Sequence, residues 1–127
     1  MRSPSGSTPS FAADVGVSSA PPPDAGGRAA KAEQVWRRYE RHLRGRSILD
    51  VGADRCHLRE HLDPDARYWG VGLGGTPDQE LDLEQGPLPF ADRSYDTVVC
   101  LDVLEHLVNP HETFDELCRV SADVVIV

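Results

Sequence analysis

The chain has 127 residues and a formal net charge of -8. This length predicts a single domain, and the negative charge argues against nucleic acid or an anionic membrane as a general partner, because phosphate groups repel it. No apolar run approaches the roughly 20 residues that cross a bilayer, and the N-terminus has no apolar segment of the signal-peptide kind. The three cysteines match no zinc spacing. We therefore expect no metal site and no membrane, and a reducing cytoplasm as the compartment.

The first elements differ sharply in composition. Residues 1–27 are rich in Ser, Pro, Gly and Ala and poor in large apolar side chains, which predicts a disordered tail before a domain at 28–127. A helix is expected at 29–43, because apolar residues recur there at spacings of three and four (Ala32, Val35, Trp36, Tyr39, Leu43). Between residues 28 and 46 there are seven basic and two acidic residues. The simplest interpretation is a solvated helix face, and attraction of an anionic substrate is the alternative.

Strands and helices then alternate along the chain. Strands are expected at 47–51, 67–73 ("RYWGVGL"), 80–83 ("ELDL"), 95–101 ("YDTVVCL") and 122–127 ("ADVVIV"). Helices are expected at 55–62, within "DVLEHL", and after Asn109, with Asn109 as N-cap and Pro110 at the first helical position. The inner face of this last helix is predicted to carry Phe114, Leu117 and Cys118, and Cys100 is expected to be buried as well.

This alternation predicts an α/β fold with a parallel sheet flanked by helices. In such sheets ligands bind beyond the carboxyl ends of the strands, beside the first strand. The residues expected at four of these ends are Asp50 and Gly52, Gly72, Asp82, and Leu101 with Asp102. The residues alone therefore predict a small-molecule site in one crevice.

Three segments together resemble class I S-adenosylmethionine-dependent methyltransferases of the kind called methyltransferase type 11. They are "LDVGADRCHL", "DLEQGPLPFADRSYDTVVCLDVLEHLVNP" and "ETFDELCRV". The resemblance covers about residues 46–127. It implies a Rossmann-like methyltransferase fold, S-adenosylmethionine as cofactor and a small-molecule methyl acceptor. The family's sheet normally has seven strands and this sequence supplies five, so we expect the last two to be missing. The apolar edge at "VVIV" is then expected to pair with a second copy or a partner protein.

The resemblance also implies roles for single residues. Asp50 and Gly52, with Ala53 beside them, match the motif that holds the methionine end of the cofactor. Asp82 and the Leu83 backbone match the position that recognises adenine. The segment that lines the cofactor and faces the substrate corresponds to Leu101 and Asp102. The remaining candidates are His106, as a base or substrate contact, and Trp36 with Tyr39, as a cover over the cofactor.

Each of these roles has a structural alternative. Asp50 is also suited to capping a turn, His106 to a structural position in a helical turn, and the aromatic pair of the first helix to core packing. Several residues also depart from the family pattern. Asp54 and Cys56 stand where the family has glycine, and Arg55 is a candidate partner for the cofactor carboxylate. Gly72 stands where the family has the acid that binds the ribose hydroxyls, and Glu80 is the candidate substitute.

These departures keep a second function open. The chain is either a methyltransferase or a non-catalytic relative, such as a pseudoenzyme, a partner subunit or a gene fragment. A nicotinamide-dependent dehydrogenase also uses a strand, a loop and a helix at its cofactor. That function does not account for "LPFADRSYDTVVCLDVLEHL", and it needs an acid at Gly72.

Overall fold

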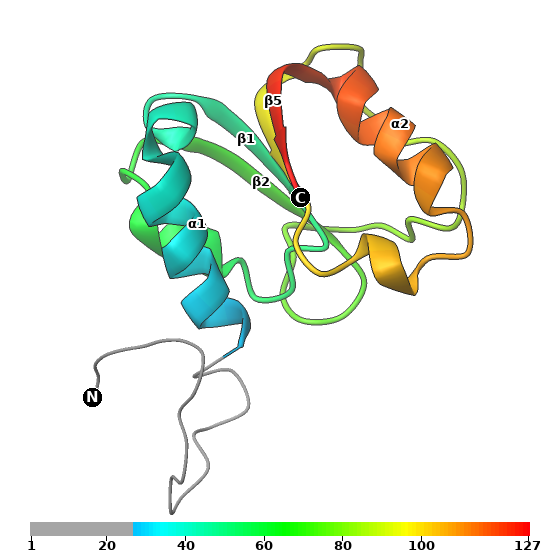
Figure 1. Cartoon of the computed structure of the whole chain (residues 1–127), viewed down its shortest axis with the longest axis horizontal. Coiled ribbons are helices and arrows are strands. Elements are labelled where there is room, and N and C mark those ends of the chain that lie inside the picture. The colour runs from blue at the N-terminus through cyan, green and yellow to red at the C-terminus, as the bar shows by residue number, and fades with distance from the viewer. Residues whose placement is uncertain (1–26) are drawn as a thin grey trace, which may run out of the picture.

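The structure is a computed structural model that describes residues 27–127. Its elements in chain order are α1 (Arg28–Leu43), β1 (Ser47–Val51), the 3-10 helix η1 (His57–His61), β2 (Arg67–Gly72), β3 (Gln79–Glu80), β4 (Tyr95–Val99), the 3-10 helix η2 (Leu104–His106), α2 (Pro110–Val120) and β5 (Ser121–Ile126) (Figure 1). The predicted tail, residues 1–27, lies outside the described residues apart from Gly27. Within the described part, no helix is long and apolar enough to cross a membrane.

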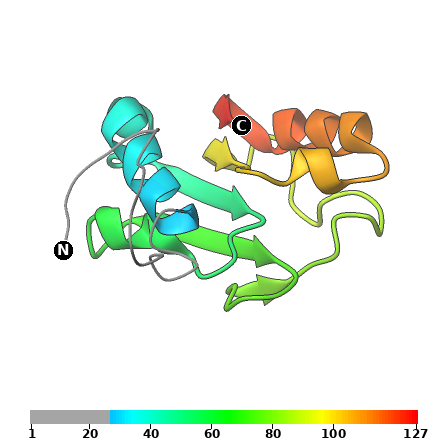
Figure 2. The same cartoon turned by 60° about the horizontal axis from the view of Figure 1, so that its bottom comes forward.

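The five strands form one sheet in the order β3-β2-β1-β4-β5, and every neighbouring pair is parallel. The predicted α/β fold with a parallel sheet is therefore confirmed. The direction of winding reverses between β1 and β4, which is where open sheets of this kind form a ligand crevice. Figure 2 shows β1 (turquoise) and β2 (green) ending side by side, next to the loops that follow them.

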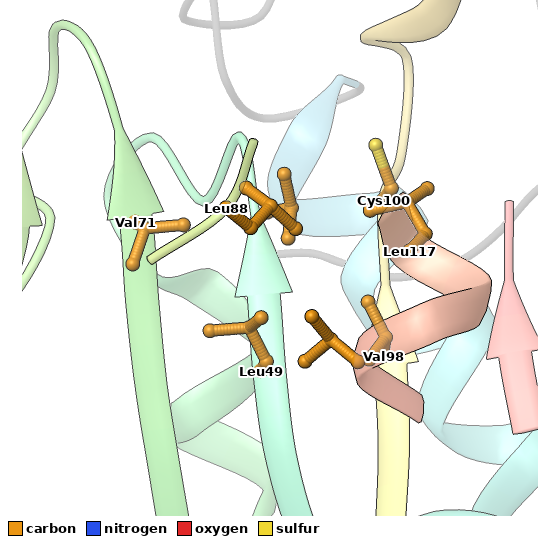
Figure 3. Packing of buried hydrophobic residues seen from close by; sticks show 8 residues of the cluster. Leu49, Val71, Leu88, Val98, Cys100 and Leu117 are labelled. Atoms are coloured by element: carbon orange, nitrogen blue, oxygen red, sulfur yellow. The ribbon is translucent and has the colours of Figure 1, made fainter. Parts of the chain in front are cut away.

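The two faces of the sheet are covered by different helices, because successive strand residues point to opposite faces. On one face, Ile48 and Val99 pack against the buried residues of α1, which are Ala32, Val35 and Leu43. On the other face, Leu49 and Val98 pack against α2 through Leu117 and Val120. Figure 3 shows the second cluster, in which Leu117 lies beside Cys100 and Val98. Cys100 is buried, as predicted.

Two predicted helices are short 3-10 helices, so these predictions are wrong in type and length. The helix expected at 55–62 spans only His57–His61, because Asp54 and Cys56 both have positive φ and a right-handed helix cannot begin before them. In the same way, "DVLEHL" forms a single turn at Leu104–His106 after Asp102, whose φ is +56°. Positive φ at non-glycine residues was not readable from the sequence.

The last helix begins as predicted, with Asn109 at the N-cap position and Pro110 in its first turn, although Asn109 makes no side-chain capping bond. Its inner face is different from the prediction. Phe114 and Cys118 are exposed, whereas the buried positions are Thr113, Leu117 and Val120. Only Leu117 was placed correctly. The sequence spacing fits either face, and contact with the sheet selects one of them.

The third strand is shorter than expected and begins one residue earlier. It covers Gln79–Glu80 instead of "ELDL". The Leu81 backbone N–H still donates to the Gly72 carbonyl, but Asp82 then starts a turn in which its carboxylate accepts the Glu84 backbone N–H at 2.9 Å. This local hydrogen bond competes with strand formation and ends β3.

Glu116 connects α2 to the long segment before β4. Its carboxylate accepts the Leu88 backbone N–H and the Arg119 Nε–H, both at 2.9 Å. We expect Glu116→Ala to lower the unfolding free energy by about 1–2 kcal/mol, because a half-buried N–H loses its acceptor. Urea unfolding measures this, with Asp115→Ala at an exposed position of α2 as control. Equal stability of the two variants would contradict the prediction.

Candidate functional site

A pocket lies where β1 and β4 end. Asp50, Gly52 and Ala53 line it from the end of β1, and Leu101 with Asp102 line it after β4. The other lining residues come from α1 and η1, namely Arg28, Lys31, Ala32, His57 and Leu58. Five of the predicted site residues are therefore brought together. The cavity measures only about 30 Å³, whereas pockets for small organic ligands hold roughly 300–1,000 Å³. The strand-end residues therefore lie together, but the cavity between them and α1 is small.

The other predicted residues lie outside this pocket. Gly72 is directly beside it, since a Cβ at this position would come within 3.2 Å of the Gly52 Cα. Asp82 lies in the turn after β3, where its carboxylate accepts the Glu84 backbone N–H. Leu83 lines a different cavity, and His106 is exposed on η2. Trp36 and Tyr39 pack against the hydrophobic cluster that contains Ile48 and the buried residues of α1, and they do not line the pocket, which favours core packing for both.

Asp50 is the most unusual ionisable residue of the pocket. Its side chain is 6% exposed and accepts a hydrogen bond from the Tyr68 hydroxyl at 2.5 Å. Burial raises the pKa of Asp50 to about 6, although the Tyr68 hydrogen bond and the positive charge of Arg28 act in the opposite direction. A buried carboxylate with a raised pKa in a cleft is a feature typical of functional sites.

Two cations of the first turn of α1 reach across the pocket to the strand ends. Lys31 Nζ lies 2.7 Å from Asp102 Oδ1, and Arg28 Nε lies 3.9 Å from Asp54 Oδ2. These side chains are 28–44% exposed, so water reaches both ion pairs. Neither cation was predicted as a site residue. The signal that was available is their position, because basic residues are unfavourable at a helix N-terminus.

His57 is a further pocket residue that the sequence did not single out. Its Nε2 atom is buried and has no hydrogen-bond partner among residues 27–127. The opposite ring nitrogen, Nδ1, lies 3.8 Å from Glu60 Oε2. Buried polar atoms are rarely left without a partner, so a ligand with a polar group fits this wall of the pocket.

The loop after β1 has positive φ at two positions that are not glycine. Asp54 and Cys56, which stand where the family has glycine, have φ values of +53° and +57°. Gly75 then allows the loop after β2 to pack closely on Asp54, because a Cβ at Gly75 would lie 2.5 Å from the Asp54 carbonyl oxygen. The Thr76 backbone N–H donates to that oxygen at 2.9 Å. The two loops therefore support each other.

Gly52 has a packing role that the sequence did not reveal. A Cβ at Gly52 would overlap the Cγ2 of Val103, which lies in the segment after β4. The backbone N–H groups of Gly52 and Ala53 both donate to the Val71 carbonyl, at 2.7 and 3.0 Å. The absence of a side chain at Gly52 thus lets the segments after β1, β2 and β4 meet, and these two N–H groups are already bonded within the protein.

A second cavity of about 350 Å³ lies between α2 and the segment after β3. It is lined by carboxylates and by no basic residue, with Glu84 from the segment and Glu112, Asp115 and Glu116 from α2. Glu84 and Glu116 accept backbone N–H groups, from Val108 and Leu88. These two carboxylates therefore already make hydrogen bonds within the protein. Among the described residues, no group of three or more His, Cys, Asp or Glu is arranged to hold a metal ion.

Comparison with solved structures identifies the class of fold. A methyltransferase from Thermotoga maritima, described as a possible histamine N-methyltransferase, is 14% identical with a TM-score of 0.53 over 73% of this chain and 46% of its own. The magnesium protoporphyrin IX methyltransferase of Synechocystis PCC 6803, with bound S-adenosylhomocysteine, is 22% identical with a TM-score of 0.53 over 73% and 51%. The chain has the Rossmann-like fold of class I methyltransferases.

The sequence comparison agrees with this class. A family model described as "Methyltransferase domain" matches residues 62–123. The predicted resemblance to class I S-adenosylmethionine-dependent methyltransferases of type 11 is thereby confirmed. A Haloferax volcanii complex between the Trm112 methyltransferase activator and a protein described as a putative methyltransferase is 22% identical, with a TM-score of 0.49 over 73% of this chain and 52% of the other. No curated protein matches the chain. The chain spans about half the length of these solved structures.

Proposed function

We infer that this chain binds S-adenosylmethionine at the pocket between β1 and β4 and acts as a methyltransferase on a small molecule. The observation that carries this function is the pocket itself. It gathers a buried carboxylate, Asp50, and two cations, Lys31 and Arg28, at the ends of the strands that bind ligands in open parallel sheets. The negative charge of the chain argues against a nucleic acid as acceptor.

The pocket residues fit the amino-acid end of this cofactor. A carboxylate at Asp50 suits an ammonium group, and the cations of α1 suit a carboxylate. The buried Nε2 of His57, which has no hydrogen-bond partner in the described part of the chain, suits a further polar group of the ligand. When bound, S-adenosylmethionine supplies an electrophilic methyl group on its sulfonium. The contribution of the protein is then mainly to bind and orient the two reactants and to exclude water.

The ribose end fits less well and supports the second candidate, a non-catalytic relative. Gly72 offers no carboxylate, and its φ of +153° and closeness to the Gly52 backbone disfavour any side chain there. Glu80 is the nearest alternative, because it is the register partner of Gly72 in the neighbouring strand β3. We assign the ribose contact to Glu80 if the chain binds the cofactor.

The roles of the remaining predicted residues stay predictions. We assign adenine recognition to Asp82 and the Leu83 backbone, the wall that faces the acceptor to Leu101 and Asp102, and the role of base or substrate contact to His106. Pairing of the β5 edge with a second copy or a partner protein, and a cytoplasmic location, are predictions as well.

Titration of the chain with S-adenosylhomocysteine tests the proposed function. We expect saturable binding by calorimetry, which falls about tenfold in Asp82→Asn because one charged acceptor is lost. The amide oxygen of Asn can still accept the Glu84 backbone N–H, so the turn after β3 is kept. Asp65→Asn, at an exposed position, is the matched control and should bind like the wild type. A folded wild-type protein without binding at millimolar ligand would favour the non-catalytic candidate.

A further inference from the structure

The first turn of α1, residues 28–31, lies over the pocket and limits its size. Arg28, Lys31 and Ala32 line one wall, and the cavity beneath them is about 30 Å³. That volume has room for about one water molecule. A ligand the size of a nucleoside joined to an amino acid therefore enters only when this turn moves. Figure 2 shows the start of α1 (blue) close to the end of β1.

The same turn is held weakly by its own helix. The N-cap residue Gly27 makes no side-chain capping bond, and the first turn contains no acidic residue. Arg28 and Lys31 oppose the helix dipole at this end. The first buried residue of α1 is Ala32, which follows the turn. A helix end with few buried contacts and no cap opens locally at low cost.

Two ion pairs, both partly exposed, hold the turn over the pocket. Lys31 pairs with Asp102 at 2.7 Å, and Arg28 approaches Asp54 at 3.9 Å. The acids lie after β4 and β1, so each pair joins the helix to a different loop of the site. Water reaches all four side chains, and ion pairs of this kind contribute little to stability.

We propose that residues 28–31 form a gate over the pocket, closed by the Lys31–Asp102 and Arg28–Asp54 ion pairs and opened by ligands that carry a zwitterionic amino-acid group. Such a group has one charge of each sign. Its carboxylate replaces Asp102 as the partner of Lys31, and its ammonium group replaces Lys31 as the partner of Asp102. Both charges of the Lys31–Asp102 pair are then paired again, whereas a ligand without the amino-acid group breaks this pair and supplies no replacement.

This gate rests on the proposed function and adds a selectivity to it. Ligands that share the adenosine part are distinguished by their amino-acid end. S-adenosylhomocysteine has this end, and 5′-methylthioadenosine lacks it. The difference in affinity between these two compounds therefore depends on the amino-acid end, because both compounds make the same contacts through adenine and ribose.

The test is the affinity of the full chain for both compounds, measured by calorimetry for the wild type, for Lys31→Met and for the control Arg41→Met. Arg41 is exposed near the end of the same helix and does not line the pocket. In Lys31→Met we expect the affinity for S-adenosylhomocysteine to fall roughly ten- to a hundredfold, because a charge-assisted contact is lost. The affinity for 5′-methylthioadenosine should rise, because the gate opens more easily. Arg41→Met should change neither.

The outcomes separate the gate from the proposed function. A fall for S-adenosylhomocysteine together with a rise for 5′-methylthioadenosine supports the gate. If the affinity for 5′-methylthioadenosine is unchanged or falls in Lys31→Met, Lys31 is only a contact for the cofactor, and the gate is overturned while cofactor binding stands. If the wild type binds neither compound, the proposed function is overturned and the gate with it. Circular dichroism of each variant shows whether α1 remains folded.

Discussion

Asp50→Asn is expected to remove a loss of stability that the wild-type protein shows as the pH rises. Burial raises the pKa of Asp50 from 3.8 to about 6 in the folded protein. The folded state therefore binds the proton more tightly than the unfolded state, so the unfolding free energy decreases as the pH rises through this range. The difference in pKa corresponds to about 3 kcal/mol. Asparagine does not titrate, so this part of the pH dependence should vanish.

Urea unfolding at pH 4 and at pH 7 measures the effect for the wild type and the variant. The other carboxylates titrate in both proteins, so the difference between the two pH profiles isolates Asp50. Asp65→Asn, at an exposed position, should follow the wild type. Tyr68→Phe should increase the loss, because the Tyr68 hydrogen bond lowers the pKa of Asp50. Parallel profiles for the wild type and Asp50→Asn would contradict the prediction.

A carboxylate that lowers stability at neutral pH has a reason other than packing. Asp50 lies at the end of β1 and lines the pocket below Arg28 and Lys31. If its role were only to cap a turn, a neutral residue would serve better in this buried place. Stability is often lower at residues that bind ligands, because their charges are arranged for the ligand. The cost at Asp50 therefore agrees with the proposed contact to an ammonium group.

The parts of the fold that depend on periodicity were predictable from the sequence. The long apolar face of α1 and the apolar runs of β1 and β4 predicted these elements within two residues or fewer at each end. The helix after β1 was not predictable in the same way. Its start depends on the backbone angles of Asp54 and Cys56, which the sequence does not display. Residue types other than glycine adopt such angles only when the surrounding structure holds them.

The site residues also fall into a predictable and an unpredictable group. Residues at the carboxyl ends of β1 and β4 were predictable, because the topology of a parallel sheet places these ends together. Arg28 and Lys31 were not, because they are distant in sequence and reach the pocket only through the packing of α1. The buried face of α2 was equally difficult to predict, since Phe114 and Leu117 are both apolar and only contact with the sheet decides which of them is buried.

Gly52→Ala is the second substitution for which we expect a large effect. Gly52 has a φ of +76°, where an alanine costs about 1–2 kcal/mol. A Cβ at this position would also overlap the Cγ2 of Val103, and overpacking of this kind costs about 1–3 kcal/mol. Together we expect the unfolding free energy to fall by about 3 kcal/mol, measured by urea unfolding at neutral pH.

Comparison with Gly45→Ala separates the cost of the positive φ from the cost of the overlap with Val103. Gly45 has nearly the same φ, +71°, but a Cβ there meets no atom within 4 Å. It should therefore show only the backbone cost of about 1–2 kcal/mol. A double-mutant cycle with Val103→Ala tests the contact directly, because removal of the Val103 methyl groups should restore part of the loss at Gly52. If Gly52→Ala and Gly45→Ala were equally destabilised, Val103 would not be what requires glycine at position 52. The meeting of the loops after β1 and β4, which shapes the pocket around Asp50 and Asp102, would then need another cause.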